Sequence, residues 1–583
     1  MKYKNFLIFF HNKSLKFKIF FTAIIFISVI IVFVDAFSIF TLLPILSISV
    51  NKNLANSVMD YSNYVPDWVL SLQQGIDLKV FFLILIIILF LRNVFHLLNN
   101  FIIYRFARYI EIDTAKKSYF LILKKKYLEL SSQTSSELIK DLRDSVGAYV
   151  LFIESVARII SDVIILLLFS SILFYLSFNE TLFIFSYFIL IFLIFSKTVT
   201  NISVRQGKKT NLSAEKINLT IINTFKNFAQ IILRKLKNKY LNIYSLNVKE
   251  FAYSRLIISF LKSNTKQFLE IFALILVVVI FLFLEKFYFE NTENLFALIT
   301  IYIVAAYRML PLVNNLAASI IKVRNLEYPF NIIHKNIKNF NKKYKNLKIE
   351  NSNIKKINFS KNLILKNITF KYPRDKDHLF KNLNLEIKKN EMIGIIGPSG
   401  EGKSTLVKIL LGLIEPISGI IKVDKKKIFQ NQVERYQMLF GYLPQQNLFI
   451  PDTIKENIAF GKDNIDEKKV VEALIKTNCM EFVKKLKNNI NYKLQEDGKN
   501  FSSGQLQRFA LARILYFNND IIILDEPTSA LDKKAEKKFI QLVNKLKRQK
   551  TIIIVSHKES TLRNCDKIYK LKNKKMIRHK RLS

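Results

Sequence analysis

The chain has 583 residues, half of them hydrophobic, and 89 Lys and Arg residues against 45 Asp and Glu give it a formal net charge of +44 at pH 7. The basic residues are spread along the whole sequence and do not gather on one aromatic motif, which disfavours a nucleic-acid partner and favours a cytoplasmic face that lies against anionic membrane lipids. The two cysteines, Cys479 and Cys565, show neither a disulfide pattern nor a metal-binding pattern.

The first half of the sequence contains long apolar segments separated by short polar or basic stretches. Residues 19–50 contain one charged residue, Asp35, and residues 163–196 contain only Glu180, at a predicted turn. Once flanking turns are included, each segment approaches or exceeds the roughly 20 residues with which a helix crosses a bilayer. So much uninterrupted apolar sequence excludes the buried core of a soluble protein. The six predicted membrane helices are 19–46, 80–104, 158–178, 181–203, 266–285 and 294–321.

Positive charge is distributed unevenly between the two sets of predicted loops. Residues 1–18 contain five lysines and no acidic residue, and the stretches 105–157 and 197–262 are strongly basic, whereas 51–79 and 285–294 are slightly acidic. The positive-inside rule therefore predicts that both termini lie in the cytoplasm. The first apolar segment is too long for a removed signal peptide and lacks a small-residue cleavage site.

Three basic residues lie within or at the edge of the predicted membrane helices: Arg92, Lys266 and Arg308. Basic residues at such positions normally face a polar cavity and mark a substrate path. Three cations around one cavity would suit an anionic group such as a phosphate or pyrophosphate. Alternatively, each one snorkels to the interface or pairs with a carboxylate such as Asp35 or Glu270.

A glycine-rich sequence in the C-terminal part fits the phosphate-binding pattern GxxxxGK[ST]. It runs from Gly397 to Ser404, between an apolar run and a segment that is helical in pattern from Thr405. Strand, glycine loop and helix are the context that such a site needs. The backbone N–H groups of the loop and the helix dipole would hold the β- and γ-phosphates, Lys403 would add a point charge, and Ser404 would offer a hydroxyl to Mg²⁺. The sequence therefore predicts ATP or GTP binding.

Two further segments extend this pattern. Residues 521–526 form an apolar run that ends in Asp525 and Glu526, as expected of a buried parallel strand that delivers carboxylates to the edge of a sheet. Asp525 would hold Mg²⁺, and Glu526 would orient and polarise the attacking water. Residues 501–508 form a polar turn that opens onto a helix, and the N-terminal N–H groups of that helix would make a second anion site.

These motifs and their order resemble the ATPase domain of ABC transporters over residues from about 360 to 570. The resemblance implies a chain of exporter type: an α-helical membrane domain with six transmembrane helices, 1–325, a linker, 326–356, and a C-terminal α/β P-loop NTPase domain, 357–583. The residues that it assigns to the nucleotide are Tyr372, Gly397, Pro398, Ser399, Gly400, Glu401, Gly402, Lys403, Ser404, Thr405, Ser502, Ser503, Gly504, Gln505 and Asp532.

The resemblance also implies individual roles. Tyr372 would stack on adenine, Gln445 would link Mg²⁺ and water to the membrane domain, and His557 would contact the γ-phosphate. Asp525 would be the Walker B aspartate and Glu526 the catalytic base, so the chain would be an ATPase. Ser404, Gln445 and Asp525 would hold Mg²⁺. The family sandwiches ATP between the Walker A loop of one domain and the signature of another, and one copy of each motif implies a homodimer.

One departure from the family pattern concerns the signature. The usual LSGGQ is FSSGQ here, at residues 501–505, so Ser503 stands where a glycine would let the backbone approach phosphate closely. Because serine is small and is itself a donor, we expect reduced and not abolished activity. The family also implies cytoplasmic coupling helices, which we expect near 135–138 and 226–232.

The membrane half resembles the bacterial lipid-linked oligosaccharide flippases represented by PglK. The resemblance rests on the segment of about 47–78, which contains the sole tryptophan, Trp68, as a predicted interfacial helix, and on residues 305–311 and 35–44. It implies a multi-pass protein of the bacterial inner membrane that moves a polyprenyl-pyrophosphate oligosaccharide to the outer leaflet, with Arg92, Lys266 and Arg308 near the pyrophosphate. The alternatives are a general lipid, lipid A, peptide or drug exporter, and an ATP-gated channel or regulator.

Overall fold

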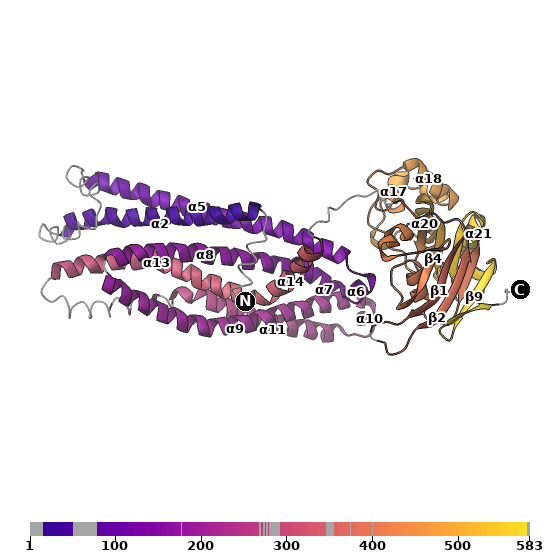
Figure 1. Ribbon diagram of the computed structural model, residues 1–583, viewed down its shortest axis with the longest axis horizontal. Helices are drawn as coiled ribbons and strands as arrows, with labels where there is room; N and C mark the ends of the chain where they lie inside the picture. Colours follow the sequence, from indigo (N-terminus) through magenta and orange to yellow (C-terminus); the bar gives the residue numbers. More distant parts are fainter. Residues whose placement is uncertain are drawn as a thin grey trace. The chain divides into compact units, whose positions relative to one another are not determined.

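The computed structural model describes residues 15–50, 78–176, 178–267, 270–271, 275, 278, 292–344, 355–373, 375–398 and 400–579. The chain forms two compact units (Figure 1). The first comprises Met1–Lys125 and Leu130–Leu347, and the second comprises Lys126–Glu129 and Lys348–Ser583.

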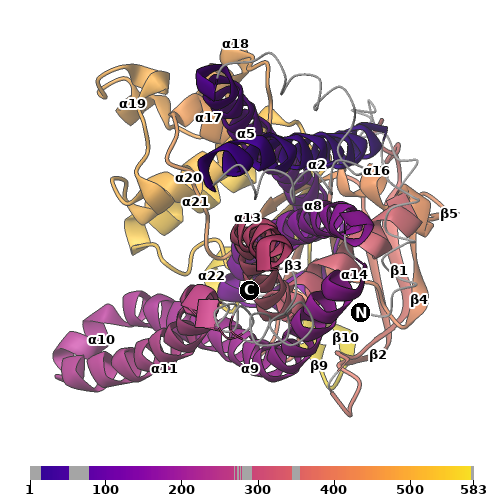
Figure 2. The ribbon, with the colours of Figure 1, turned by 90° about the vertical axis from the view of Figure 1, so that its left-hand side faces the viewer.

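The first unit is built from long helices that lie side by side (Figure 1). Its long helices are α2 (Leu15–Val50), α5 (Leu78–Leu123), α8 (Ser145–Leu176), α9 (Phe178–Lys226), α11 (Lys237–Ser263), α13 (Thr292–Asn325) and α14 (Glu327–Tyr344). Its short helices are α7 (Ser135–Ile139) and α10 (Phe228–Leu233), and helix α6 (Tyr127–Ser131) lies mostly in the segment that groups with the second unit. Figure 2 shows that α9, α10 and α11 project together to one side of α2 and α5. Helices satisfy their own backbone groups, which is the requirement that lipid imposes.

Membrane-spanning character is strongest in three helical stretches of the described residues. Leu15–Ser38, Phe82–Leu123 and Ser135–Tyr175 are long and apolar enough to cross a bilayer. The six predicted spans are therefore not all recovered, and the fifth, 266–285, falls mostly outside the described residues. So does the predicted interfacial helix around Trp68. The number six stays a prediction.

Several helices run further than the sequence predicts. The predicted span 80–104 continues to Leu123 within α5, because buried apolar residues recur at helical spacing beyond its predicted end, as at Phe106, Ala107 and Ile110. The predicted tips at 135–138 and 226–232 do form short helices, α7 and α10. The segment that groups with the second unit is 126–129, and the coupling roles stay a prediction.

Helix α14 occupies most of the predicted linker, 326–356. It groups with the first unit, and the two units divide at 347/348, while the predicted domain boundaries stay a prediction. The cause of this grouping is an apolar face on this helix: Phe330, Ile333 and Ile337 are buried against α8 and its neighbours. The Phe330 ring stacks on Tyr149 and Phe152 with centroid distances of 5.1 and 3.9 Å.

The second unit contains two sheets. The four-stranded antiparallel sheet has the order β2-β1-β4-β5, from strands β1 (Asn362–Phe370), β2 (Phe380–Lys388), β4 (Ser418–Val423) and β5 (Lys426–Lys427). The six-stranded sheet has the order β10-β9-β3-β8-β7-β6. Its strands are β3 (Met392–Ile396), β6 (Phe440–Leu443), β7 (Ile521–Asp525), β8 (Thr551–Val555), β9 (Lys567–Lys572) and β10 (Lys575–His579). All neighbouring strands of this sheet pair in parallel except β9 and β10.

Side chains alternate between the two faces of the six-stranded sheet. The helices of this unit are α15 (Lys403–Leu410), α16 (Val433–Gln437), α17 (Ile454–Ile458), α18 (Glu467–Lys476), α19 (Met480–Val483), α20 (Ser503–Tyr516), α21 (Lys533–Leu546) and α22 (Glu559–Leu562). One face of the six-stranded sheet packs on buried residues of α18, α20 and α21, and the other face packs on α15 and on the four-stranded sheet. Because β3, β6, β7 and β8 are parallel, the loops that follow them meet at one edge.

Candidate nucleotide site

The glycine loop lies at this edge, between β3 and α15, as predicted. Gly402 has a φ of +100° at the N-terminus of α15, and a Cβ there would lie 2.9 Å from the Leu379 side chain and 3.0 Å from Phe380. Only glycine fits such a position without strain. The Lys403 ammonium donates to the carbonyl oxygens of Gly397 and Pro398 at 2.7 and 2.9 Å, so it folds back over the loop.

The remaining loop residues take different environments. Ser404 is exposed at the start of α15, where its hydroxyl is accessible to a metal ion, whereas Thr405 is buried. Gly400 and Glu401 lie in the loop itself, and Ser399 falls outside the described residues. The loop therefore presents the N-terminus of α15 together with one lysine, which is the arrangement that holds a phosphate.

Tyr372 lies next to the glycine loop, although strands β2 and β3 separate the two in the sequence. Its hydroxyl is 2.9 Å from the Thr405 hydroxyl, and its ring meets Phe370 edge-on with a centroid distance of 5.1 Å. Contacts with α15 and β1 therefore fix the position of the Tyr372 ring. Stacking of this ring on adenine stays a prediction.

Asp525 ends β7 and is buried. The Tyr442 hydroxyl, from the neighbouring strand β6, donates to Asp525 Oδ2 at 3.3 Å. Burial raises the pKa of Asp525, the hydrogen bond from Tyr442 opposes this rise, and the neighbouring charge of Glu526 adds to it. A bound cation would oppose this rise in pKa, because its positive charge stabilises the ionised carboxylate, so Asp525 is suited to Mg²⁺.

Glu526 and His557 are in direct contact although they follow different strands. Glu526 Oε1 lies 2.8 Å from His557 Nδ1, the Glu526 side chain is 12% exposed and the His557 ring is 61% exposed. Glu526 has a φ of +48°, a conformation that residues other than glycine rarely adopt, and its N–H donates to the Val555 carbonyl at 2.8 Å. This backbone turns the Glu526 side chain toward the loop that carries His557.

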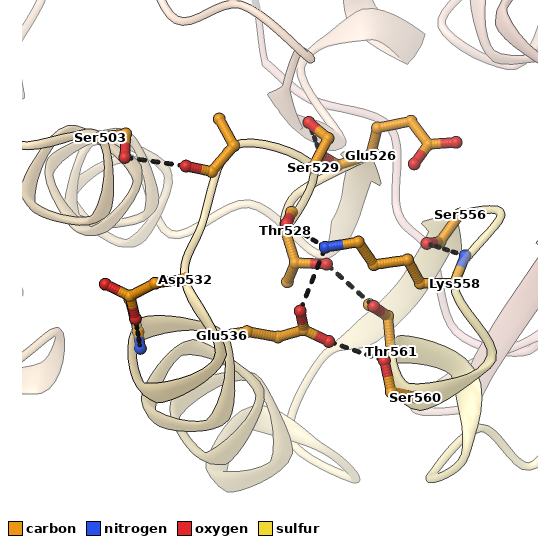
Figure 3. Close-up of polar contacts among 12 residues, drawn as sticks. Ser503, Glu526, Thr528, Ser529, Asp532, Glu536, Ser556, Lys558, Ser560 and Thr561 are labelled. Carbon is orange, nitrogen blue, oxygen red and sulfur yellow. Dashed lines mark hydrogen bonds and ion pairs between the residues drawn. The ribbon is translucent and has the colours of Figure 1, made fainter.

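The signature residues form the N-terminus of α20. Ser502 is the N-cap: its hydroxyl accepts from the Gln505 N–H at 3.3 Å, and the Gln505 side chain accepts from the Ser502 N–H at 2.9 Å. The Ser503 hydroxyl donates to the Ala530 carbonyl at 2.9 Å (Figure 3). A Cβ on Gly504 would lie 3.3 Å from the Ala535 Cβ. The helix end therefore packs closely on the loop before α21.

The two remaining predicted residues are Asp532 and Gln445. Asp532 is the N-cap of α21, since its carboxylate accepts from the Ala535 N–H at 2.7 Å. This capping role explains an aspartate at position 532 even without a contact with the nucleotide. Gln445 is exposed shortly after β6, at the same edge as the glycine loop.

Comparison with known proteins now adds to this geometry. Residues 380–529 match the family described as "ABC transporter". The C-terminal unit contains an ABC transporter domain.

The relatives and the fold extend this assignment. Over 213 residues, 36% of this chain, the ABC domain is 38% identical to "ATP-binding cassette sub-family B member 5" of Mus musculus. Over 213 residues it is 35% identical to "ATP-dependent lipid A-core flippase" of Saccharophagus degradans. The matched region spans 17% and 36% of the length of these relatives. The whole chain has the fold of "Structure of a bacterial Atm1-family ABC exporter with ATP bound", with a TM-score of 0.75, 18% identity, and coverage of 96% of this chain and 94% of that one.

Outside the ABC domain, two of the three predicted substrate cations contact carboxylates in the described part of the chain. Arg92 Nε lies 2.5 Å from Asp35 Oδ1, and Lys266 Nζ lies 3.4 Å from Glu270 Oε1. Both side chains thus pair with a carboxylate, which was the alternative interpretation, and their contact with a substrate stays a prediction. The side chain of Arg308, within α13, falls outside the described residues.

Sequence reasoning did not single out several polar residues of the ABC domain edge. Tyr442 lies in β6, which contains no predicted site residue. Lys558 and Glu536 belong to no predicted motif. The only local signal is the position of Lys558 directly after His557. Their contacts depend on strand order and helix packing, which a linear pattern does not contain.

Proposed function

We propose that the chain is an ATP-driven exporter or flippase whose ABC domain hydrolyses ATP. The observation that carries this proposal is the contact between Glu526 and His557 at the same sheet edge as the glycine loop and Asp525. A base, its orienting partner, a phosphate cradle and a buried carboxylate for a cation are the parts that phosphoryl transfer needs.

Each part has a defined task in this proposal. The loop N–H groups and Lys403 bind the phosphates, and the Ser404 hydroxyl, Gln445 and the Asp525 carboxylate hold Mg²⁺. When bound, Mg²⁺ neutralises charge on the phosphates. Glu526 accepts the proton of the attacking water, and His557 keeps its carboxylate in position. The exposed His557 ring also has room to contact a phosphate.

A second copy of the chain completes the site. The N-terminal N–H groups of α20 would form a second anion site, in addition to the glycine loop at the N-terminus of α15. We infer that ATP lies between the glycine loop of one copy and Ser502–Gln505 of another, so the working unit is a homodimer.

For the substrate, we infer an amphipathic lipid, with a polyprenyl-pyrophosphate oligosaccharide as the narrower candidate. Support for a lipid comes from the likeness of the ABC domain to a lipid A-core flippase and from the long apolar helices of the first unit. The pairing of Arg92 and Lys266 with acids weakens their attraction for a pyrophosphate. It favours the broader alternative, a general exporter of lipids, peptides or drugs.

The test is ATP turnover of the full chain in nanodiscs, with wild type beside Glu526→Gln. We expect the substitution to lower turnover at least about a hundredfold, because a general base contributes factors of 10² to 10⁴. The matched control is Glu472→Gln, which makes the same chemical change at an exposed position of α18 and should leave turnover unchanged. Equal turnover of wild type and Glu526→Gln would refute the proposed site.

The same preparation tests the substrate. Turnover that rises with polyprenyl-pyrophosphate oligosaccharide, and not with plain phospholipid or hydrophobic drugs, supports the flippase function. Turnover that depends on Glu526 but rises with phospholipid or drugs supports the general exporter.

A further inference from the structure

Lys558 directly follows His557 and reaches across to two other segments of the ABC domain. Its ammonium donates to the Thr528 carbonyl oxygen at 2.8 Å and lies 3.2 Å from Glu536 Oε2 (Figure 3). Thr528 belongs to the loop after β7, and Glu536 lies in the first turns of α21. One side chain therefore links the His557 loop, the 527–532 loop and α21.

The carboxylate that Lys558 meets is held from its other side. Ser560, at the start of α22, donates its hydroxyl to Glu536 Oε1 at 2.7 Å. Both carboxylate oxygens of Glu536 are thus engaged, and its side chain is only 14% exposed. Although burial alone would raise the pKa of Glu536, the hydrogen bonds from Ser560 and Lys558 lower it, so the carboxylate is ionised at neutral pH.

The loop that carries His557 is anchored immediately before and after that residue. On one side, the Ser556 hydroxyl accepts from the Lys558 N–H at 3.0 Å, and Ser556 itself is buried. On the other side lies the ammonium contact of Lys558 with Thr528. A second buried contact joins the 527–532 loop to α22, the helix that directly follows Lys558, because the Thr528 and Thr561 hydroxyls are 2.9 Å apart. His557 itself is the exposed member between these anchors.

The 527–532 loop contacts the signature helix as well. The Ser503 hydroxyl donates to its Ala530 carbonyl, and the Ser529 hydroxyl donates to the Glu526 carbonyl at 3.0 Å (Figure 3). A movement of this loop would therefore displace Glu526 and, through Lys558, also His557.

We propose that Lys558 is a positioning residue: by bridging the Thr528 carbonyl and the Glu536 carboxylate, it holds His557 against Glu526 and couples this pair to the 527–532 loop. This inference rests on the proposed ATP hydrolysis. Lys558 need not touch the nucleotide, so its loss should slow the chemical step and leave ATP binding intact.

The experiment measures kcat, the KM for ATP and ATP binding for the full chain in nanodiscs. The variants are Lys558→Met, which keeps the apolar stem and removes the charge, Lys558→Arg, which keeps a cation, and Glu536→Gln. The matched control is Lys547→Met. Lys547 also bridges a backbone carbonyl, that of Asn564 at 2.7 Å, and a carboxylate, that of Asp566 at 2.8 Å, but it contacts neither loop of the site.

We expect Lys558→Met to lower kcat per ATP-binding molecule about tenfold and to change KM by less than about twofold, as loss of an interaction made for the chemical step requires. Lys558→Arg should recover most of this loss. Because Lys558 and Glu536 act as a pair, the double variant with Glu536→Gln should be no slower than Lys558→Met alone. Lys547→Met should keep the wild-type kcat.

Three results would overturn the proposal: a wild-type kcat in Lys558→Met, a rise in KM without a fall in kcat, or an equal loss of kcat in Lys547→Met. Counting only ATP-binding molecules removes the contribution of misfolded chains, and Glu536→Gln tests the same bridge from its other end. Glu526→Gln separates the two hypotheses. If wild type and Glu526→Gln turn over equally, the proposed function fails; if they differ while Lys558→Met matches wild type, only the positioning role fails.

Discussion

The side chain of Ser503 has two opposing effects. It replaces the glycine of the usual signature, so its Cβ adds bulk beside backbone N–H groups that face an anion in the proposed dimer. Its hydroxyl, in contrast, makes a useful contact with the Ala530 carbonyl. The expected fall in activity from the first property is therefore accompanied by a hydrogen bond that orders the 527–532 loop.

Ser503→Gly and Ser503→Ala separate these properties. We expect Ser503→Gly to raise ATP turnover a few-fold, because removal of the Cβ outweighs the loss of a hydrogen bond worth about 1 kcal/mol. Ser503→Ala keeps the Cβ and loses the hydroxyl, so its turnover should not exceed that of wild type. Steady-state kinetics of the two variants is the measurement. A gain in Ser503→Ala equal to that in Ser503→Gly would show that the hydroxyl, and not the Cβ, limits turnover.

The two cysteines are inert thiols in the folded ABC domain. Burial raises the pKa of Cys479 to about 12 and that of Cys565 to about 12, and both side chains are fully buried. Since the thiolate is the reactive form, neither cysteine should react with a thiol reagent such as DTNB at pH 8 in the native protein. Both should react after unfolding in guanidinium. Rapid reaction of one thiol in the native state would contradict this expectation.

At the scale of secondary structure, α21 begins directly after Asp532, whose side chain caps the helix. If this is its only task, Asp532→Asn should keep both stability and turnover, because asparagine caps equally well. Asp532→Ala should lower the free energy of unfolding by about 1 kcal/mol, the usual value of an N-cap. Chemical denaturation and ATP turnover are the two measurements. Loss of turnover in Asp532→Asn without loss of stability would instead support the predicted contact with nucleotide.

Helices α2 and α5 are joined by the pair of Asp35 and Arg92, in which Asp35 is 3% exposed and Arg92 23%. Breaking a buried pair from one side leaves a buried charge. We therefore expect Arg92→Met to lower stability by about 3 kcal/mol, and Arg92→Met with Asp35→Leu to lower it less.

Thermal unfolding in detergent measures both variants of this pair. The control is Lys266→Met, because the pair of Lys266 and Glu270 is exposed and should contribute less than about 1 kcal/mol. A double variant less stable than Arg92→Met alone would contradict the stabilising pair of Arg92 and Asp35.

At the scale of the whole molecule, the proposed function requires two copies. A chain of 68.3 kDa should therefore behave in nanodiscs as a particle with twice that protein mass, and ATP turnover should belong to this species. Mass photometry combined with turnover of each separated fraction measures this. Full turnover in a fraction that contains single chains would contradict the shared site.

Short sequence motifs predicted the main parts of the nucleotide site. The glycine loop, the buried run ending in Asp525 and Glu526, and the helix that opens after Ser502 are all found in the structure. Each depends on residues close together in sequence: a turn that needs glycine, an apolar strand, a helix cap. The resemblance of the C-terminal part to the ATPase domain of ABC transporters is confirmed by the family match over residues 380–529, and the predicted exporter fold by the structural match. The resemblance to PglK stays a prediction.

The sequence alone thus established two kinds of domain, the order of the nucleotide motifs and the apolar character of the long helices, because these are properties of short stretches of chain. Only the tertiary structure decided which side chains meet. Arg92 and Asp35 are 57 positions apart, Tyr442 and Asp525 are 83 apart, and Lys558 and Glu536 are 22 apart. Such contacts are set by strand order and helix packing. For the same reason the apolar face of α14, which reads as linker in the sequence, becomes part of a core once its neighbours are in place.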